Sequence, residues 1–319
     1  MKKEIPIFFT IDDKYAPYVS VAISSIIENA SKEYNYKIII IYQELTNENI
    51  EKISRLQNDN FKIEFVYMKD TLDAITDRVE NRLRCDYFTL TIYFRLFIPE
   101  MFKEYDKGIY IDSDIVVPGD ISELYNFELG DNLIGACPDH SVVDIPEIIN
   151  YMENAIGVNR HEYINSGVLL MNLKKMREEK FDQRFLELLN KYHFDSIAPD
   201  QDYLNAMCNG SILYLDECWD AMPIEGKKEL DNPKLIHYNL FSKPWCYDNI
   251  PYEDYFWKYA KKSDYYNDIV NFKNTYSDEQ KKSDSDCLTV LIKKADTVPN
   301  EEITFKKIYE SGEKVRVWL

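Results

Sequence analysis

Short apolar runs alternate with amphipathic stretches along the first 67 residues. Residues 5–10 and 36–42 are continuous apolar runs that predict buried strands, and residues 61–67 alternate as a strand does. Between the first two runs, residues 18–29 place apolar side chains at helical spacing, and Thr46 is suited to cap a second helix. The order strand, helix, strand, helix, strand predicts the opening of a doubly wound α/β domain.

The chain up to residue 250 continues with further elements of both kinds. Residues 89–102 and 174–192 are predicted to be helical, and Asp200 is expected to cap another helix that ends at Gly210. Apolar runs predict strands within residues 107–117, 133–137, 167–173, 211–215 and 234–238.

Charge divides the chain unevenly. The formal net charge is −18, but residues 252–319 hold 12 basic and 13 acidic residues and contribute only −1 of it. We therefore expect a main domain at 1–250 and a partly helical C-terminal appendage at 251–319. So acidic a surface repels phosphate backbones and argues against nucleic acid as a partner. An anionic nucleotide would need local cations.

The appendage permits two interpretations. Its Trp257, Lys258, Tyr259, Lys261 and Lys262 could touch the inner face of a membrane, although near-neutral charge argues against this. The favoured interpretation is a helical addition that packs on the domain or on a second copy of the chain. Packing on a second copy would give a homo-oligomer.

Six cysteines occur without CxxC or zinc-finger spacing, which predicts free thiols in a reducing compartment. Aspartates interrupt the N-terminal apolar run too early for a signal peptide, and no stretch approaches ~20 apolar residues. We expect a cytoplasmic protein.

The triplet Asp112-Ser113-Asp114 interrupts a long apolar segment. Alternation along a strand directs both carboxylates to one side, and two such oxygens suit Mg²⁺ or Mn²⁺. One alternative is a surface turn. Another is an aspartate-nucleophile phosphatase, but its Asp-x-Asp lies near the start of the fold and is usually followed by threonine, whereas Ile115 follows here.

A second candidate segment contains His237 and Lys243. A histidine after an apolar strand is commonly a satisfied core residue, and Lys243 could simply be solvated. Combined with the carboxylates, however, an imidazole favours Mn²⁺ over Mg²⁺, and Lys243 is suited to contact phosphate.

These residues lie in segments that resemble the family 8 glycosyltransferases, which include bacterial lipopolysaccharide galactosyl- and glucosyltransferases and glycogenin. The resemblance covers about residues 4–250. Its segments are, in order, FFTIDDKYAPY, TIYFRL, YIDSDIVV, YINSGVLLMNL, PDQDYLN and HYNLFSKPW.

The resemblance implies a GT-A fold, a UDP-glucose or UDP-galactose donor, Mn²⁺, retention of the anomeric configuration, and a glycan, glycolipid or glycoprotein acceptor. It implies that Asp112, Asp114 and His237 ligate the metal and that Lys243 contacts the diphosphate. The other implied donor-binding residues are Thr10 and Ser113, Asp12 and Tyr15 for the uridine, Arg95 for the donor sugar or the diphosphate, and Asn165, Asp200 and Gln201 around the transferred sugar.

Two positions depart from the family pattern. Lys14 replaces a smaller polar residue, and Leu240 replaces a common glycine, so we expect the loop around Leu240 to approach the diphosphate less closely.

Two alternative functions stay open. A sugar-nucleotide-forming nucleotidyltransferase would need a glycine-rich loop after the first strand, where this chain has IDDKYAP. A non-catalytic UDP-sugar-binding protein of the same fold is the other alternative.

Overall fold

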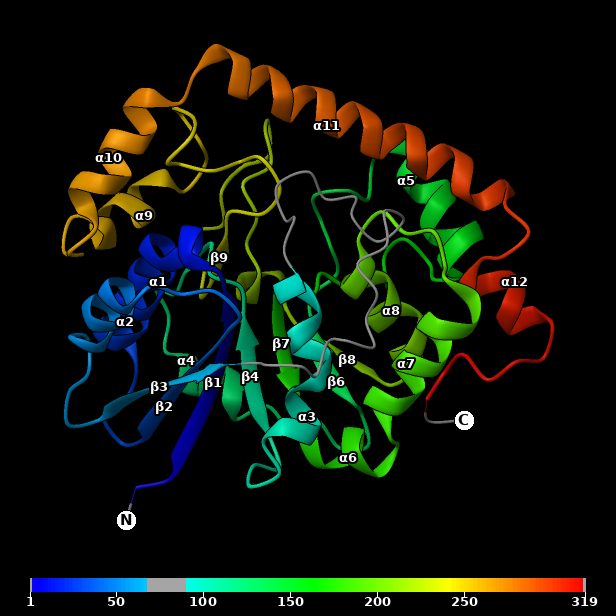
Figure 1. Cartoon of the computed structure of the whole chain (residues 1–319), viewed down its shortest axis with the longest axis horizontal. Coiled ribbons are helices and arrows are strands. Elements are labelled where there is room, and N and C mark those ends of the chain that lie inside the picture. Colours follow the sequence, from blue (N-terminus) through cyan, green and yellow to red (C-terminus); the bar gives the residue numbers. More distant parts are fainter. Residues whose placement is uncertain (1, 68–89, 318–319) are drawn as a thin grey trace.

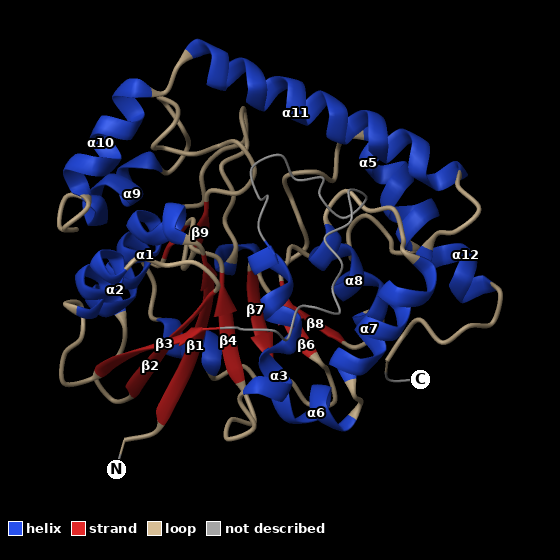
Figure 2. Cartoon of the chain, viewed as in Figure 1, coloured by secondary structure: helices blue, strands red, loops and turns tan. Residues whose placement is uncertain are grey.

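A mixed sheet of seven strands lies at the centre of the protein, in the order β3-β2-β1-β4-β7-β6-β8 (Figures 1 and 2). This computed structural model describes residues 2–67 and 90–317; Cys85 lies outside the described residues. The strands of this sheet are β1 (Glu4–Ile11), β2 (Asn35–Tyr42), β3 (Phe61–Tyr67), β4 (Gly108–Ile111), β6 (Ile134–Ala136), β7 (Val168–Met171) and β8 (Ile212–Tyr214). A small second sheet pairs β5 (Ile115–Val116) with β9 (Ile236–His237).

Helices surround these sheets (Figure 2). The α-helices are α1 (Ala16–Asn29), α2 (Asn47–Ser54), α3 (Ile98–Met101), α4 (Ile121–Tyr125), α5 (Pro146–Tyr151), α6 (Leu173–Glu178), α7 (Phe181–Tyr192), α8 (Pro199–Cys208), α9 (Glu253–Ala260), α10 (Tyr266–Thr275), α11 (Asp278–Thr297) and α12 (Phe305–Glu310). Shorter 3₁₀ helices span Asp13–Tyr15, Leu90–Phe97, Glu217–Trp219 and Val298–Asn300, and a π-helix spans Met152–Ile156.

The opening of the fold is the doubly wound unit that the sequence predicts. β1, β2 and β3 are parallel neighbours, and every residue of β1 after Glu4 is buried, as the continuous apolar run indicates. Thr46 caps α2, because its hydroxyl oxygen accepts a hydrogen bond from the backbone N–H of Asn49 at 3.4 Å. This part of the prediction is confirmed.

Two of the predicted helices differ from the structure. Residues 90–97 form a 3₁₀ helix and α3 follows, because Pro99 fits only the first turn of a new helix. Residues 174–192 are not one helix: α6 ends at Glu178, and Lys180 adopts a left-handed φ of 54° before α7.

The expectation that Asp200 caps a helix is wrong. The N-cap of α8 is Ala198, and Pro199 takes the first helical position. Asp200 therefore lies inside the first turn, where its side chain is available for other contacts.

The C-terminal residues are helical in part, as predicted. They pack in two hydrophobic clusters of the core, one around α7 and α8 and one around β1 and α1. Helix α11 crosses the molecule from α10 to α5 (Figure 1). Phe305 packs in the core with the α7–α8 region, and Phe256 and Tyr259 pack in the core around β1 and α1. The division of the chain at residue 250 stays a prediction.

The charged and aromatic residues of α9, and Lys262 just after it, face the main domain in part. Tyr259 is fully buried, and Lys258 and Lys262 both pair with Glu28 of α1. The expected packing on the domain is confirmed for these three residues. No helix within 2–67 or 90–317 combines the length and the apolar character that crossing a membrane requires. The five described cysteines are free, as expected.

Replacing Phe305 tests how firmly the C-terminal helices belong to the core. Its ring stacks on Phe194 with centroids 3.8 Å apart, and 1% of the residue is exposed. We expect Phe305→Ala to lower the free energy of unfolding by about 3–5 kcal/mol, measured by urea denaturation. Val290→Ala, at a 52% exposed position of α11, is the control and should change it by less than about 0.5 kcal/mol. An equal, small effect of both would contradict this packing.

Candidate functional site

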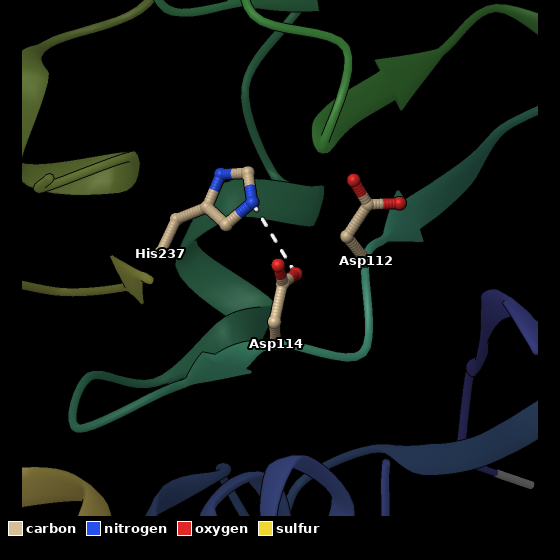
Figure 3. Close-up of side chains that lie close together, drawn as sticks. All are labelled: Asp112, Asp114 and His237. Carbon is tan, nitrogen blue, oxygen red and sulfur yellow. Dashed lines mark ion pairs between the residues drawn. The ribbon is translucent and has the colours of Figure 1, made fainter. Parts of the chain in front are cut away.

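Strand pairing brings three side chains together that are distant in the sequence. Asp112 directly follows β4, and β9 pairs with β5 so that His237 lies opposite Ile115, next to Asp114. The backbone N–H of Tyr238 donates to the carbonyl of Asp114 at 2.9 Å and fixes this register. Ligand atoms of Asp112, Asp114 and His237 all lie within 4.8 Å of one another (Figure 3).

The side chain of His237 lies between two carboxylates, those of Asp114 and Asp220. Its Nε2 lies 3.3 Å from Oδ1 of Asp114, and its Nδ1 lies 3.1 Å from Oδ1 of Asp220, which is fully buried. Burial opposes the charged imidazole, but Asp114 and Asp220 outweigh it and raise the pKa of His237 to about 10. A carboxylate on one ring nitrogen is the arrangement that orients metal-binding histidines through the other.

Asp114 is enclosed by cations. It is 3% exposed and forms ion pairs with His237 and with Nζ of Lys243, which also donates to the carbonyl of Tyr238 at 2.6 Å. Burial alone would raise the pKa of Asp114, but Lys243 and His237 hold it well below the ordinary value. Asp114 is therefore an anion in the folded protein.

Arg95 connects the metal-ligand candidates to α8. Its Nη2 lies 2.7 Å from Oδ1 of Asp112, and its Nη1 lies 3.0 Å from Oδ2 of Asp200. Burial opposes its charge, but these two carboxylates outweigh burial and raise the pKa of Arg95. Both ion pairs join separate elements of the fold rather than neighbouring turns of one helix.

A chain of hydroxyl groups supports Asp112. The hydroxyl of Tyr110 donates to Oδ1 of Asp112 at 2.6 Å and shares a 2.8 Å hydrogen bond with Thr10. Thr10 thus reaches Asp112 through Tyr110, and Ser113 lies buried between the two aspartates.

The side-chain amides of Asn165 and Gln201 converge on Asp139, a residue that was not predicted from the sequence. Both side-chain amides donate to Oδ2 of Asp139, at 2.9 and 3.0 Å, and Asp139 is 2% exposed. Asp139 lies just beyond β6, at the same edge of the sheet as Asp112, because β6 and β4 both pair antiparallel with β7. A single aspartate after a short apolar run gave no signal beyond that of a turn.

Asp200 and Gln201 both contact Ser166. The hydroxyl of Ser166 donates to Oδ2 of Asp200 at 2.9 Å, and its backbone N–H donates to Oε1 of Gln201 at 3.1 Å. Asp202, which follows Gln201 in α8, is fully buried and accepts hydrogen bonds from the hydroxyls of Tyr151 and Tyr163. This anchor fixes the first turn of α8, so that Asp200 and Gln201 face the site.

Asp12 and Tyr15 lie at the end of β1. The carboxylate of Asp12 accepts the backbone N–H groups of Lys14 and Tyr15, so Asp12 does cap a helical turn. Tyr15 and Lys14 line a pocket of about 500 Å³ together with Lys243. The structure thus brings Tyr15 and Lys243 to one cavity, whose other walls come from α1, the segment after β9, α10 and α11.

Gly167 leaves just enough room for the three ligand candidates. A Cβ at this position would lie 2.3 Å from Cε1 of His237 and 2.8 Å from Oδ2 of Asp112. Two carboxylates and one oriented imidazole, drawn together where only glycine fits, form a donor set that suits a divalent ion such as Mn²⁺.

Leu240 keeps a glycine-like backbone although it has a side chain. Its φ is 49°, in the left-handed region, and it lines a small cavity together with Asp139, Val142 and Tyr163. The effect of this residue on the approach of a diphosphate stays a prediction.

The sequence of the chain is similar to those of known glycosyltransferases. The sequence profile of glycosyl transferase family 8 matches residues 6–249. A protein of Haemophilus influenzae is 30% identical over 220 residues, which are 69% of this chain and 64% of that protein. The lipopolysaccharide 1,2-glucosyltransferase of Escherichia coli is 27% identical over 295 residues, covering 84% of this chain and 83% of the enzyme.

The crystal structure of galactosyltransferase LgtC in complex with donor and acceptor sugar analogues has the same fold. Its TM-score is 0.68 at 25% sequence identity, over 82% of this chain and 96% of LgtC. The expected GT-A fold is confirmed.

Gly167→Ala should damage the metal-ligand cluster in particular. The added methyl group has to displace His237 or Asp112, so we expect Mn²⁺ affinity to fall at least about tenfold by calorimetry. Gly135→Ala in the same sheet is the control, because its Cβ would approach Leu129 no closer than 3.3 Å. Unchanged Mn²⁺ affinity in a folded Gly167→Ala protein would contradict the assignment of this cluster.

Proposed function

Because the chain belongs to glycosyltransferase family 8, we propose that it is a metal-dependent, retaining hexosyltransferase that uses a UDP-sugar. The hexose would be glucose or galactose, and the acceptor a glycan, glycolipid or glycoprotein. The observation that carries the proposal is the convergence of Asp112, Asp114 and His237 beside Lys243 and Arg95. The glucosyltransferase and galactosyltransferase relatives support a hexose.

Asp112, Asp114 and His237 would hold Mn²⁺, with Mg²⁺ as the alternative. When bound, the ion would supply positive charge to the diphosphate of the donor as the sugar–phosphate bond breaks. Lys243 already lies at Asp114 and would contribute a second positive charge to the same leaving group. Asp12 and Tyr15 would bind the uridine.

The hydrogen-bonded group around Asp139 would bind the transferred sugar. Asn165, Asp139 and Gln201 present amide and carboxylate groups within one network, and Arg95 links this network through Asp200 to the metal ligands. Buried, mutually oriented polar groups of this kind suit the recognition of sugar hydroxyls.

Retention of configuration would follow from attack by the acceptor on the face that the diphosphate leaves. A double displacement needs an enzyme nucleophile, and Oδ2 of Asp200 is instead occupied by Arg95 and Ser166. Gln201 offers only a weakly basic amide oxygen. Trapping a glycosyl-Asp200 species by mass spectrometry, in the absence of acceptor, would refute same-face attack.

Two alternative functions lead to different results. A nucleotidyltransferase would form UDP-sugar from a sugar phosphate and UTP, and a non-catalytic protein would bind UDP-sugar without consuming it.

We further propose a cytoplasmic location, with the acceptor reached at the inner face of the membrane.

Asp112→Asn and His237→Ala should each lower UDP-sugar turnover at least about 100-fold, because each removes a ligand of the ion that stabilises the leaving group. Hydrolysis of a panel of UDP-sugars with Mn²⁺ measures this. Asp131→Asn and His161→Ala, at exposed positions, are the matched controls and should keep full activity. Undiminished turnover in both site variants would remove them from the active site.

UDP binding should require a divalent ion. In calorimetry we expect binding with Mn²⁺, weaker binding with Mg²⁺ and at least about 100-fold weaker binding after chelation, since the acidic cluster repels the diphosphate without the ion. Equally tight binding with and without metal would contradict the proposed bridging role.

A further inference from the structure

Two side chains of the C-terminal helices reach the loop that carries Lys243. We call residues 239–249 the Lys243 loop. Lys273 of α10 lies at one side of it and Asp284 of α11 at another, and both are half-buried. Figure 1 shows α10 and α11 next to each other along one border of the molecule.

The ammonium group of Lys273 contacts three acceptor groups of the loop. Its ammonium group donates to the backbone carbonyls of Pro244, at 2.7 Å, and Tyr247, at 2.5 Å, and pairs with the carboxylate of Asp248 at 2.9 Å. The carboxylate is 83% exposed, so that ion pair is weak in water, whereas the two carbonyl contacts fix the course of the main chain directly after Lys243.

Asp284 binds the same segment through a tyrosine. Its Oδ2 accepts the hydroxyl of Tyr247 at 2.5 Å and that of Tyr276 at 2.7 Å. Tyr276 follows α10 directly, so Asp284 connects both C-terminal helices to the loop.

The other side of the loop rests on α1 and α9. Trp245 stacks on Tyr18 of α1 with centroids 4.1 Å apart and packs on Phe256 of α9. The loop is therefore enclosed between α1 on one side and α10 and α11 on the other, with Lys243 directed at Asp114.

We propose that Lys273 and Asp284 are positioning residues that hold the Lys243 loop in place and thereby keep Lys243 at the metal-ligand cluster. The role in donor binding rests on the proposed function; the hold on the loop does not. The polar contacts of Lys273 are with the loop and not with Asp112, Asp114 or His237, so it acts through the loop. Asp284 holds the loop through Tyr247 and also lines the pocket that contains Tyr15 and Lys243.

Lys273→Met tests the hold on the loop without any nucleotide. The variant keeps the aliphatic stem and removes the ammonium group. We expect amide hydrogen exchange in residues 243–248 to accelerate at least about tenfold, while β1 and α1 exchange as in the parent protein. Lys262→Met is the matched control, because it also removes a lysine that joins the C-terminal helices to the domain, but at Glu28. Lys273→Arg should restore protection.

Mn²⁺-dependent UDP affinity tests the consequence. We expect it to fall about tenfold in Lys273→Met and in Asp284→Ala, and to stay unchanged in Lys262→Met and in Asp286→Ala, an exposed neighbour on α11. Unaltered loop exchange in Lys273→Met, or equal acceleration in Lys262→Met, would overturn the positioning role. If the parent protein binds no UDP, the proposed function fails, and the exchange experiment still decides the hold on the loop.

Discussion

Negative charge on the buried Asp114 and on the neighbouring, partly exposed Asp112 is the constraint around which the rest of the site is arranged. Asp114 is 3% exposed and pairs with His237 and Lys243, and Asp112 pairs with Arg95. A buried carboxylate left without its partner costs about 3–5 kcal/mol, so these cations are a condition of stability as well as of chemistry. The cations come from two other segments, Arg95 for Asp112 and the His237–Lys243 segment for Asp114, so three distant parts of the sequence converge at the two aspartates.

Part of this arrangement could be predicted because it is local. An apolar run followed by Asp-x-Asp places two carboxylates at the end of a strand, and β4 with Asp112 is the result. The position of His237 beside Asp114, in contrast, depends on a contact between distant segments. It depends on pairing between β5 and β9, each two residues long, and strands so short leave no periodicity from which a partner could be inferred.

The residues that were missed or misassigned share a physical reason. Asp139 and Asp220 are single aspartates whose partners come from other elements, so the sequence presents them like any turn residue. Asp200 matched the pattern of a helix cap, but Pro199 took the first helical position and Ala198 became the cap. The carboxylate was thereby left for Arg95 and Ser166.

Backbone strain ties the site to the C-terminal helices. Of the five non-glycine residues with positive φ in the described part of the chain, Leu240, Asn249 and Tyr252 lie in or just beyond the Lys243 loop. Such conformations cost about 1–3 kcal/mol each unless surrounding contacts hold them. Lys273 binds the segment between Leu240 and Asn249 at the carbonyls of Pro244 and Tyr247, and Lys243 of the same loop pairs with Asp114. The proposed hold on the loop therefore links the neutralisation of the buried aspartate to the docking of the C-terminal helices.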